Sequence, residues 1–368
     1  MAKNRVSPGN LLLAALPMAD RMRLTGDHPP VDLAISDELS QAGKSIRYVY
    51  FPIDGFISLI TPGIDRAQLE IGLVGNEGML GVPLLLGVDT SPLKAPFEKK
   101  KASGKSAKAA MTFPGGTHDL WIRYWLAAGG IDPDKDVDTI VVPPPQMVAN
   151  MKVGTMDSFC VCEPWNLQLI HQSIGYTAIT TGELWEKHPE KSLGVRAAYV
   201  DKYPNAAMAI LMATMEAQQW CEKMENREEV AAICAKRQWI NCPVEDVTER
   251  MKGKFDYGIP DKVVENSPHI MRYWKDNASY PFQSHDLWFI TEDTRWGKYE
   301  SGFDAKTLIK KVNREDLWRD AAKSLDVAAA EIPTSTSRGQ EKFFDGKIFD
   351  PENPAAYLKS LTIKRVEV

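Results

Sequence analysis

The composition of the chain changes sharply near residues 91–94. All ten tryptophans and all five cysteines follow this point, beginning with Trp121 and Cys160, whereas the first ninety residues contain neither. The chain has 368 residues, of which 44% are apolar, and a folded domain typically has about 100–200 residues. We therefore expect two folded parts of different origin, joined near residues 91–94.

Charge and hydropathy exclude several classes of function. The formal net charge is −5, so no basic surface for nucleic acid is expected, and any anion site must be local. No apolar run approaches the about 20 residues that a membrane helix needs. The first residues resemble a signal peptide weakly, with Lys3 and Arg5 ahead of an apolar stretch, but Pro17 interrupts that stretch and no small-residue cleavage motif follows. We expect no export by this segment and a cytoplasmic location for the chain as it stands.

The five cysteines show no metal-binding or disulfide pattern. None of them forms a C-x-x-C pair, and Cys160 and Cys162 are only two residues apart. Such isolated cysteines more often pack in a core than bind a metal. We expect neither a metal site nor a cofactor.

The residues from Ile46 to about residue 90 are typical of a small all-β structure. Short runs of β-branched and aromatic residues are separated by Asp54–Gly55, Pro62–Gly63 and residues 76–78. Strands of about 5–6 residues that alternate with such turns indicate a β-roll or jelly roll.

The next hundred residues alternate between two patterns. Three apolar, strand-like runs at 107–113, 137–142 and 156–161 are each followed by a helical stretch. This βαβαβ order predicts a parallel sheet covered by helices. Ligands of such sheets bind at the carboxyl ends of the strands.

The turn after the first of these strands is the strongest candidate site. Gly115 and Gly116 permit close approach of a ligand to the backbone, Thr117 is a candidate N-cap, and His118 can supply a ring N–H donor. The first N–H groups of a helix can bind an anion. Taken alone, however, a Gly-Gly pair before a helix more often serves the turn than a ligand.

Motifs that would indicate an enzyme are absent or incomplete. Residues 103–106 resemble the end of a phosphate loop, but Lys99 stands where its first glycine is needed. Residues 132–138 resemble a calcium loop, but Val137 replaces its glycine. The chain has no G-x-S-x-G, H-E-x-x-H or G-x-G-x-x-G motif. We therefore expect a binding protein and no enzyme, and we interpret the lysine-rich run 97–108 as a solvated connector.

The pattern becomes helical after about residue 193. Met208, Leu211, Met212 and Met215 fall on one helical stripe that is typical of a core face, and Pro204 suits a helix start. Further helices are predicted at 227–238 and 304–324.

The early segment resembles the sensory domain of the Crp/Fnr regulators. The likeness lies in YFPIDGFISL at 50–59 and GLVGNEGMLGVPLLLG at 72–87, and it covers about residues 9–92. The arginine that holds the ligand phosphate in that family has no counterpart here, and no helix-turn-helix follows. The resemblance therefore implies a β-roll fragment without cyclic-nucleotide binding.

The rest of the chain resembles a different family. FPGGTHDLWIRYWLAAGGIDPDKDV at 113–137, TGELWEKHPEKSLGVRA at 181–197 and FQSHDLWFITEDTRWGKYE at 282–300 are similar to the nitrate-binding proteins of cyanobacterial-type nitrate/nitrite ABC importers. VVPPPQMVANMKVGTMDSFCV with the following EPW and FFDGKIFDPENPAAYLKSL extend the likeness from about Leu93 to the C-terminus. The bicarbonate-binding paralogue is close behind.

This second resemblance implies a fold and a site. The fold is α/β, with one βαβαβ lobe of a type II periplasmic-binding protein, a helical C-terminal part and a partial jelly roll in front. The implied domains are 1–92, 93–192 and 193–368. The family's anion contacts correspond to His118, Cys162 and Lys191, with Gly115, Gly116 and Thr117 in support. The implied partners are nitrate or nitrite, and the permease and ATPase subunits of an importer. His118 favours nitrate over bicarbonate.

Two departures from the family pattern weaken this expectation. Cys162 stands where the family has glycine, and its side chain is expected to enter space that the anion needs. The part of the first lobe that precedes LKAPF in the family is replaced by the Crp-like segment. We therefore expect impaired binding, with a bicarbonate-binding protein or a regulator fusion as the alternatives.

Overall fold

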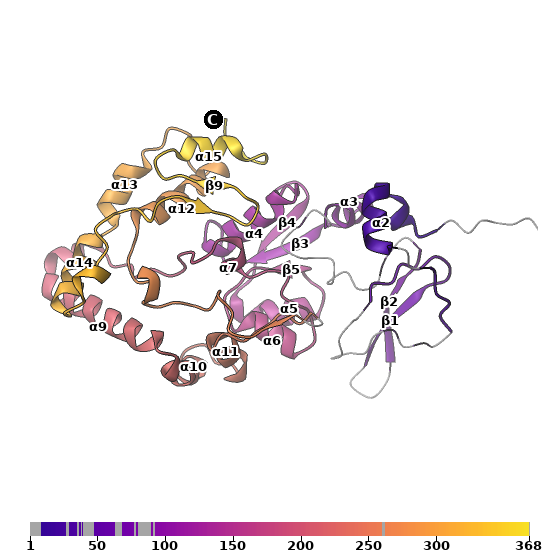
Figure 1. Ribbon diagram of the computed structural model, residues 1–368, viewed down its shortest axis with the longest axis horizontal. Coiled ribbons are helices and arrows are strands. Elements are labelled where there is room, and N and C mark those ends of the chain that lie inside the picture. Colours follow the sequence, from indigo (N-terminus) through magenta and orange to yellow (C-terminus); the bar gives the residue numbers. More distant parts are fainter. Residues whose placement is uncertain are drawn as a thin grey trace, which may run out of the picture. The chain divides into compact units, whose positions relative to one another are not determined.

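The computed structural model describes residues in two compact units (Figure 1). The N-terminal unit contains residues 1–87 and 258–263, and the main unit contains residues 88–257 and 264–368. The described residues are 9–26, 29–34, 37, 39, 48–62, 68–76, 79, 90, 93–259 and 262–367. The expected division at 92 and 192 stays a prediction.

The described part of the N-terminal unit holds two short helices and one strand pair. The helices are α1 (Leu11–Ala14) and α2 (Met18–Thr25), and β1 (Ile57–Pro62) pairs antiparallel with β2 (Gln68–Val74). Asn10 caps α1, since its side chain accepts a hydrogen bond from the Leu13 N–H at 3.0 Å. Of the expected β-roll, the described residues show this one strand pair. Residues 63–67 and 80–89 lie outside the described part of the chain.

The main unit contains the parallel sheet that the sequence predicted. β3 (Ala107–Met111) lies between β4 (Val137–Val141) and β5 (Ser158–Phe159), in the order β4-β3-β5. Both neighbours run parallel to β3. The βαβαβ prediction is therefore confirmed, although β5 is shorter than the predicted 156–161. The lysine-rich run predicted as a connector is in part a helix, α3 (Lys94–Ala102), and Lys100 forms an ion pair with Asp157 at 2.6 Å.

Helices cover both faces of this sheet. α4 (Thr117–Ala128) packs Ile122 and Leu126 against Ala109 of β3. The opposite face packs Ala110 against residues of α5 (Met147–Lys152), α6 (Trp165–His171) and the loop before α6. Successive strand residues point to opposite faces, which is why Ala109 and Ala110 belong to different clusters. η3 (Pro144–Gln146) leads into α5.

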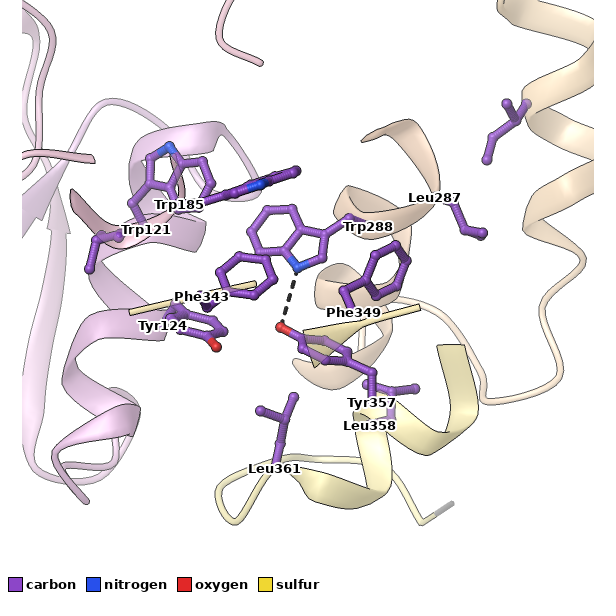
Figure 2. Packing of buried hydrophobic residues seen from close by; sticks show 12 residues of the cluster. Trp121, Tyr124, Trp185, Leu287, Trp288, Phe343, Phe349, Tyr357, Leu358 and Leu361 are labelled. Atoms are coloured by element: carbon purple, nitrogen blue, oxygen red, sulfur yellow. Dashed lines mark hydrogen bonds between the residues drawn. The ribbon is translucent and has the colours of Figure 1, made fainter. Parts of the chain in front are cut away.

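A cluster of buried aromatic rings joins the sheet region to the C-terminal part of the chain (Figure 2). Trp288 of α12 (Gln283–Arg295) stacks on Trp121 of α4 with ring centroids 5.0 Å apart, and on Phe343 at 5.4 Å. Its indole N–H donates to the Tyr357 hydroxyl of α15 (Pro354–Ser360) at 3.2 Å, the dashed line in Figure 2. Trp185, directly after α7 (Thr181–Leu184), packs on the same rings. Four segments distant in sequence therefore share one core.

The helices after residue 193 form a second core. On α9 (Pro204–Glu222), Met215 is fully buried against Trp318 of α14 (Glu315–Ser324). Met208, Leu211 and Met212 pack on the same cluster, which confirms the predicted stripe. The helix predicted at 304–324 is two helices, because Asn313 and Arg314 leave the helical conformation between α13 (Ala305–Val312) and α14.

The remaining elements are short. The described ranges contain α8 (Ala197–Lys202), η4 (Met224–Asn226), α10 (Arg227–Ala235), α11 (Glu245–Met251), β6 (Phe255–Asp256), β7 (Val263–Val264), η5 (Lys275–Asn277), η6 (Ala329–Glu331), and the antiparallel pair β8 (Glu341–Lys342) and β9 (Ile348–Phe349). No helix in these ranges has both the length and the apolar character that crossing a membrane requires.

We expect Trp288→Ala to lower the free energy of unfolding by about 3–5 kcal/mol, because truncating a fully buried tryptophan leaves a cavity among the stacked rings. Trp239→Ala is the matched control, since the Trp239 side chain is 68% exposed, and its effect is expected within about 0.5 kcal/mol. Urea denaturation followed by circular dichroism measures both. Equal losses in the two variants would contradict the proposed role of the aromatic cluster.

The aromatic cluster also predicts a pH dependence. His188 and His285 pack edge-on against Trp121 and Trp185, and burial lowers the pKa of both imidazoles below their usual value. As the pH falls through about 6.5, these histidines bind protons in the unfolded chain but not in the folded protein. The free energy of unfolding therefore decreases with falling pH. Each histidine contributes up to about 1.4 kcal/mol per pH unit.

Urea denaturation at pH 7.5 and 5.5 measures this effect. We expect wild-type protein to be less stable at the lower pH and His188→Gln to show a smaller difference between the two pH values. An identical difference in both proteins would show that His188 does not keep a lowered pKa in the folded state.

Candidate functional site

The turn between β3 and α4 is shaped by two glycines. Gly115 has φ +79°, and a Cβ there would lie 2.5 Å from Nζ of Lys298. A Cβ on Gly116 would lie 2.6 Å from the ring of Phe113. Only glycine fits these positions without movement of a neighbour. The turn therefore brings the start of α4 close to the carboxyl end of β3.

The N-cap of α4 is Gly116, and Thr117, predicted as the cap, is the first helical residue. Because Gly116 has no side chain, the cap makes no side-chain hydrogen bond. Among the described residues, none accepts a hydrogen bond from the backbone N–H of Thr117, His118 or Asp119. The hydroxyl of Thr117 is thus free of the capping role that the sequence had suggested.

His118 is the second residue of α4 and is buried. Its Nδ1 lies 3.0 Å from the Thr112 hydroxyl, and its Nε2 lies 3.9 Å from the nearer carboxylate oxygen of Glu190. A hydroxyl that donates to Nδ1 leaves the ring proton on Nε2, the nitrogen that faces Glu190. Burial lowers the pKa of His118, an effect that Glu190 opposes. The ring is therefore a neutral N–H donor at neutral pH.

Lys191 and Thr117 meet the same carboxylate. Nζ of Lys191 lies 2.9 Å from Oε2 of Glu190, and the Thr117 hydroxyl donates to Oε1 at 3.4 Å. The Lys191 side chain is 75% exposed. The structure thus brings Thr117, His118 and Lys191 together around Glu190. Sequence reasoning had missed Glu190, although it stands next to Lys191 in the HPEK motif.

The loop that carries Cys162 borders this group. Cys162 is partly buried and packs against the apolar cluster around Met147 and Trp165. Burial raises the pKa of its thiol, with Lys191 lowering it and Glu190 raising it, so the thiol lies within electrostatic reach of both charges. The thiol therefore has apolar neighbours, and the expectation that it fills the anion's space stays a prediction.

A buried arginine holds this loop in place. Arg250 of α11 forms an ion pair with Glu163, whose other oxygen accepts a hydrogen bond from the Leu167 N–H at 3.1 Å. Arg250 also donates to the Thr177 hydroxyl and to the Asp256 carbonyl, both at 2.8 Å. Sequence reasoning missed this residue because it lies 87 positions from Glu163, and no local pattern connects the two.

Within the part of the chain that the structure describes, no group of three or more His, Cys, Asp or Glu side chains is arranged to hold a metal ion. The five cysteines are free thiols. Around the Glu190 carboxylate the structure gathers hydrogen-bond donors and one positive charge: backbone N–H groups, a hydroxyl, a neutral imidazole and the Lys191 ammonium group. Such a set suits an anion.

Comparison with known proteins gives consistent results. The profile of the NMT1-like family matches residues 42–235. The nitrate/nitrite binding protein NrtA of Synechocystis is 57% identical over 308 residues, which are 83% of this chain and 68% of that protein. NrtA of Nostoc is 56% identical over 77% of this chain and 64% of its own length. The bicarbonate-binding protein CmpA of Synechococcus elongatus is 44% identical over 72% of this chain and 60% of its own length. The chain thus spans about two thirds of the length of these relatives.

A solved structure shows the same fold. The crystal structure of the periplasmic nitrate-binding protein NrtA from Synechocystis matches with a TM-score of 0.74 and 51% identity, over 86% of this chain and 77% of that one. The fold is therefore the α/β periplasmic-binding-protein fold. Membership of this group confirms the expectation of a binding protein rather than an enzyme.

The comparisons do not support a separate regulator-like domain before residue 92. The family profile runs without a break across residues 91–94, and the match to Synechocystis NrtA is longer than the stretch 93–368. The similarity to binding proteins thus extends into the segment that resembled the Crp/Fnr β-roll. With a profile that matches more than half of its residues and a relative 57% identical to it, this chain belongs to the NMT1-like family, in the group that contains the nitrate/nitrite binding protein NrtA.

Proposed function

We propose that this chain is the substrate-binding component of a nitrate/nitrite ABC importer. The observation that carries the proposal is the convergence of Thr117, His118 and Lys191 on one carboxylate at the start of α4. A planar anion with delocalised charge can use the same donors. The proposed site consists of His118, Cys162 and Lys191, with Gly115, Gly116 and Thr117 in support.

Hydrogen-bond geometry suits a small planar anion. The first N–H groups of α4 and the His118 Nε2–H supply fixed donors, and the helix dipole adds positive potential at that end. Lys191 supplies the formal charge. Because burial keeps His118 neutral, the site carries one cationic side chain for a monovalent anion.

Sequence similarity favours nitrate or nitrite over bicarbonate. Relatives described as nitrate/nitrite binding proteins are 56–57% identical to the chain, whereas the bicarbonate-binding relative is 44% identical. Part of an importer ATPase is also similar to this chain. The nitrate import ATP-binding protein NrtC of Synechocystis is 34% identical to the chain over 37% of its own length. We infer a permease and an ATPase as partners.

The inferred place of action is the periplasm, because the solved relative is a periplasmic protein. The expectation of a cytoplasmic location finds no support in these comparisons. Impaired binding of nitrate, expected from the sequence, is a separate prediction, and calorimetric titration with nitrate tests it.

We expect nitrate to bind saturably to wild-type protein in isothermal titration calorimetry, and Lys191→Ala to weaken binding by about tenfold or more, since a hydrogen bond to a charged group contributes about 1.5–3 kcal/mol. Lys187→Ala is the matched control: it removes a positive charge four residues away that is paired with Asp276 at 3.2 Å. Nitrite, bicarbonate and cyclic AMP are titrated in parallel.

Three outcomes would contradict the proposed function: no saturable binding of nitrate or nitrite, tighter binding of bicarbonate, or equal effects of the two lysine substitutions. If binding is impaired, the nitrate dissociation constant lies above the micromolar range, and Cys162→Gly does not restore it. A micromolar constant in wild-type protein would disprove the impairment while it supports the proposed function.

A further inference from the structure

We infer that Glu190 is an internal competitor for the proposed anion site. Its carboxylate takes up donors of that site and must leave before an anion can bind to them. The inference rests on the proposed function, because it concerns the same group of donors. It adds a residue that controls the affinity and selectivity of the site without being one of its donors.

The contacts of Glu190 carry this inference. Oε1 accepts a hydrogen bond from the Thr117 hydroxyl at 3.4 Å and lies 3.9 Å from Nε2 of His118, and Oε2 lies 2.9 Å from Nζ of Lys191. Each of these three partners is a residue assigned to the anion site on independent grounds. A carboxylate is planar, carries one delocalised charge and accepts hydrogen bonds in its plane, as nitrate, nitrite and bicarbonate do.

Charge makes joint occupation by Glu190 and an anion unfavourable. Lys191 is the lysine that pairs with Glu190, and this ion pair leaves no net positive charge on the two side chains. His118 does not add one, because burial lowers its pKa. An anion that entered beside Glu190 would meet a like charge in a partly desolvated place. Binding therefore requires that the carboxylate move away.

Local structure permits this movement. Residues 188–196 have no helix or strand, and the segment connects the end of α7 at Leu184 to the start of α8 at Ala197. The hydrogen bond from Thr117 to the carboxylate is long, His118 lies 3.9 Å away, and the short contact is to the adjacent Lys191. Displacing Glu190 thus breaks no backbone hydrogen bond of a helix or strand, and Lys191 is then free to pair with the anion.

The predicted consequence is selectivity by competition. A site that is filled by its own carboxylate about 90% of the time binds an external anion about tenfold more weakly than the open site. An anion binds well only if it uses the α4 donors better than a carboxylate does. Weak carboxylate-like ligands such as formate are excluded by the same contacts.

Glu190→Gln tests the inference, because glutamine keeps the shape of the side chain and removes its charge. We expect the variant to bind nitrate about tenfold or more tightly than wild-type protein in calorimetry, and to gain formate binding. Glu186→Gln is the matched control, since Glu186 is exposed and lies in the segment between α7 and Glu190; its affinities are expected to equal those of wild-type protein. Glu190→Ala, with a thermal melt to verify folding, provides a second variant.

The pKa of His118, followed by NMR, is an independent readout. Glu190 raises this pKa, so Glu190→Gln is expected to lower it even when no anion is present. If wild-type protein binds nitrate and Glu190→Gln binds it equally or more weakly, the inference is wrong and the proposed function stands. If neither protein binds nitrate or nitrite but the variant gains another small anion, the proposed function is wrong and the competitor role stands. No anion binding in any variant would overturn both.

Discussion

The position of the candidate site depends on the edge contact between Trp121 and His188, whose ring centroids lie 5.0 Å apart. Trp121 is one turn after His118 on α4, and His188 lies two residues before Glu190. Trp121 also stacks on Trp288, which in turn stacks on Phe343 (Figure 2). The aromatic core thus holds the segment with Glu190 and Lys191 over the first turn of α4. Without it the donors of the site would belong to two unconnected parts of the chain.

A regular helix and a segment without regular secondary structure are combined at this site. The glycine turn leads directly into α4, and a Cβ on Gly115 or Gly116 would require the side chain of Lys298 or Phe113 to move. The loop at Cys162 is held by the ion pair of the buried Arg250 with Glu163. Glu190 and Lys191, by contrast, lie in a segment without helix or strand. In the proposed competition the Glu190 carboxylate takes up the Thr117 hydroxyl and Lys191, and this limits which anions can bind there.

Local sequence patterns predicted the elements of the main unit well, because period and turn chemistry agree there. The three strands, the glycine turn and the start of α4 near His118 followed from residues close to one another in sequence. The same reasoning predicted a connector for the lysine-rich run, although part of this run forms much of α3. It also predicted one helix where α13 and α14 are separate. It gave Thr117 the N-cap that Gly116 holds. Only the last error concerns an element end, where assignments commonly differ by a residue.

The sequence by itself determined the βαβαβ order, the donor-rich turn and the family resemblance, since each depends on short-range spacing. Tertiary structure alone decided that Glu190 meets Thr117 across 73 positions of chain, and that Arg250 holds the loop of Cys162. The reason is physical: these contacts are made by side chains whose proximity is created by the packing of the aromatic core. Hydrophobic periodicity reports on residues close together in the sequence and does not predict contacts between residues this far apart.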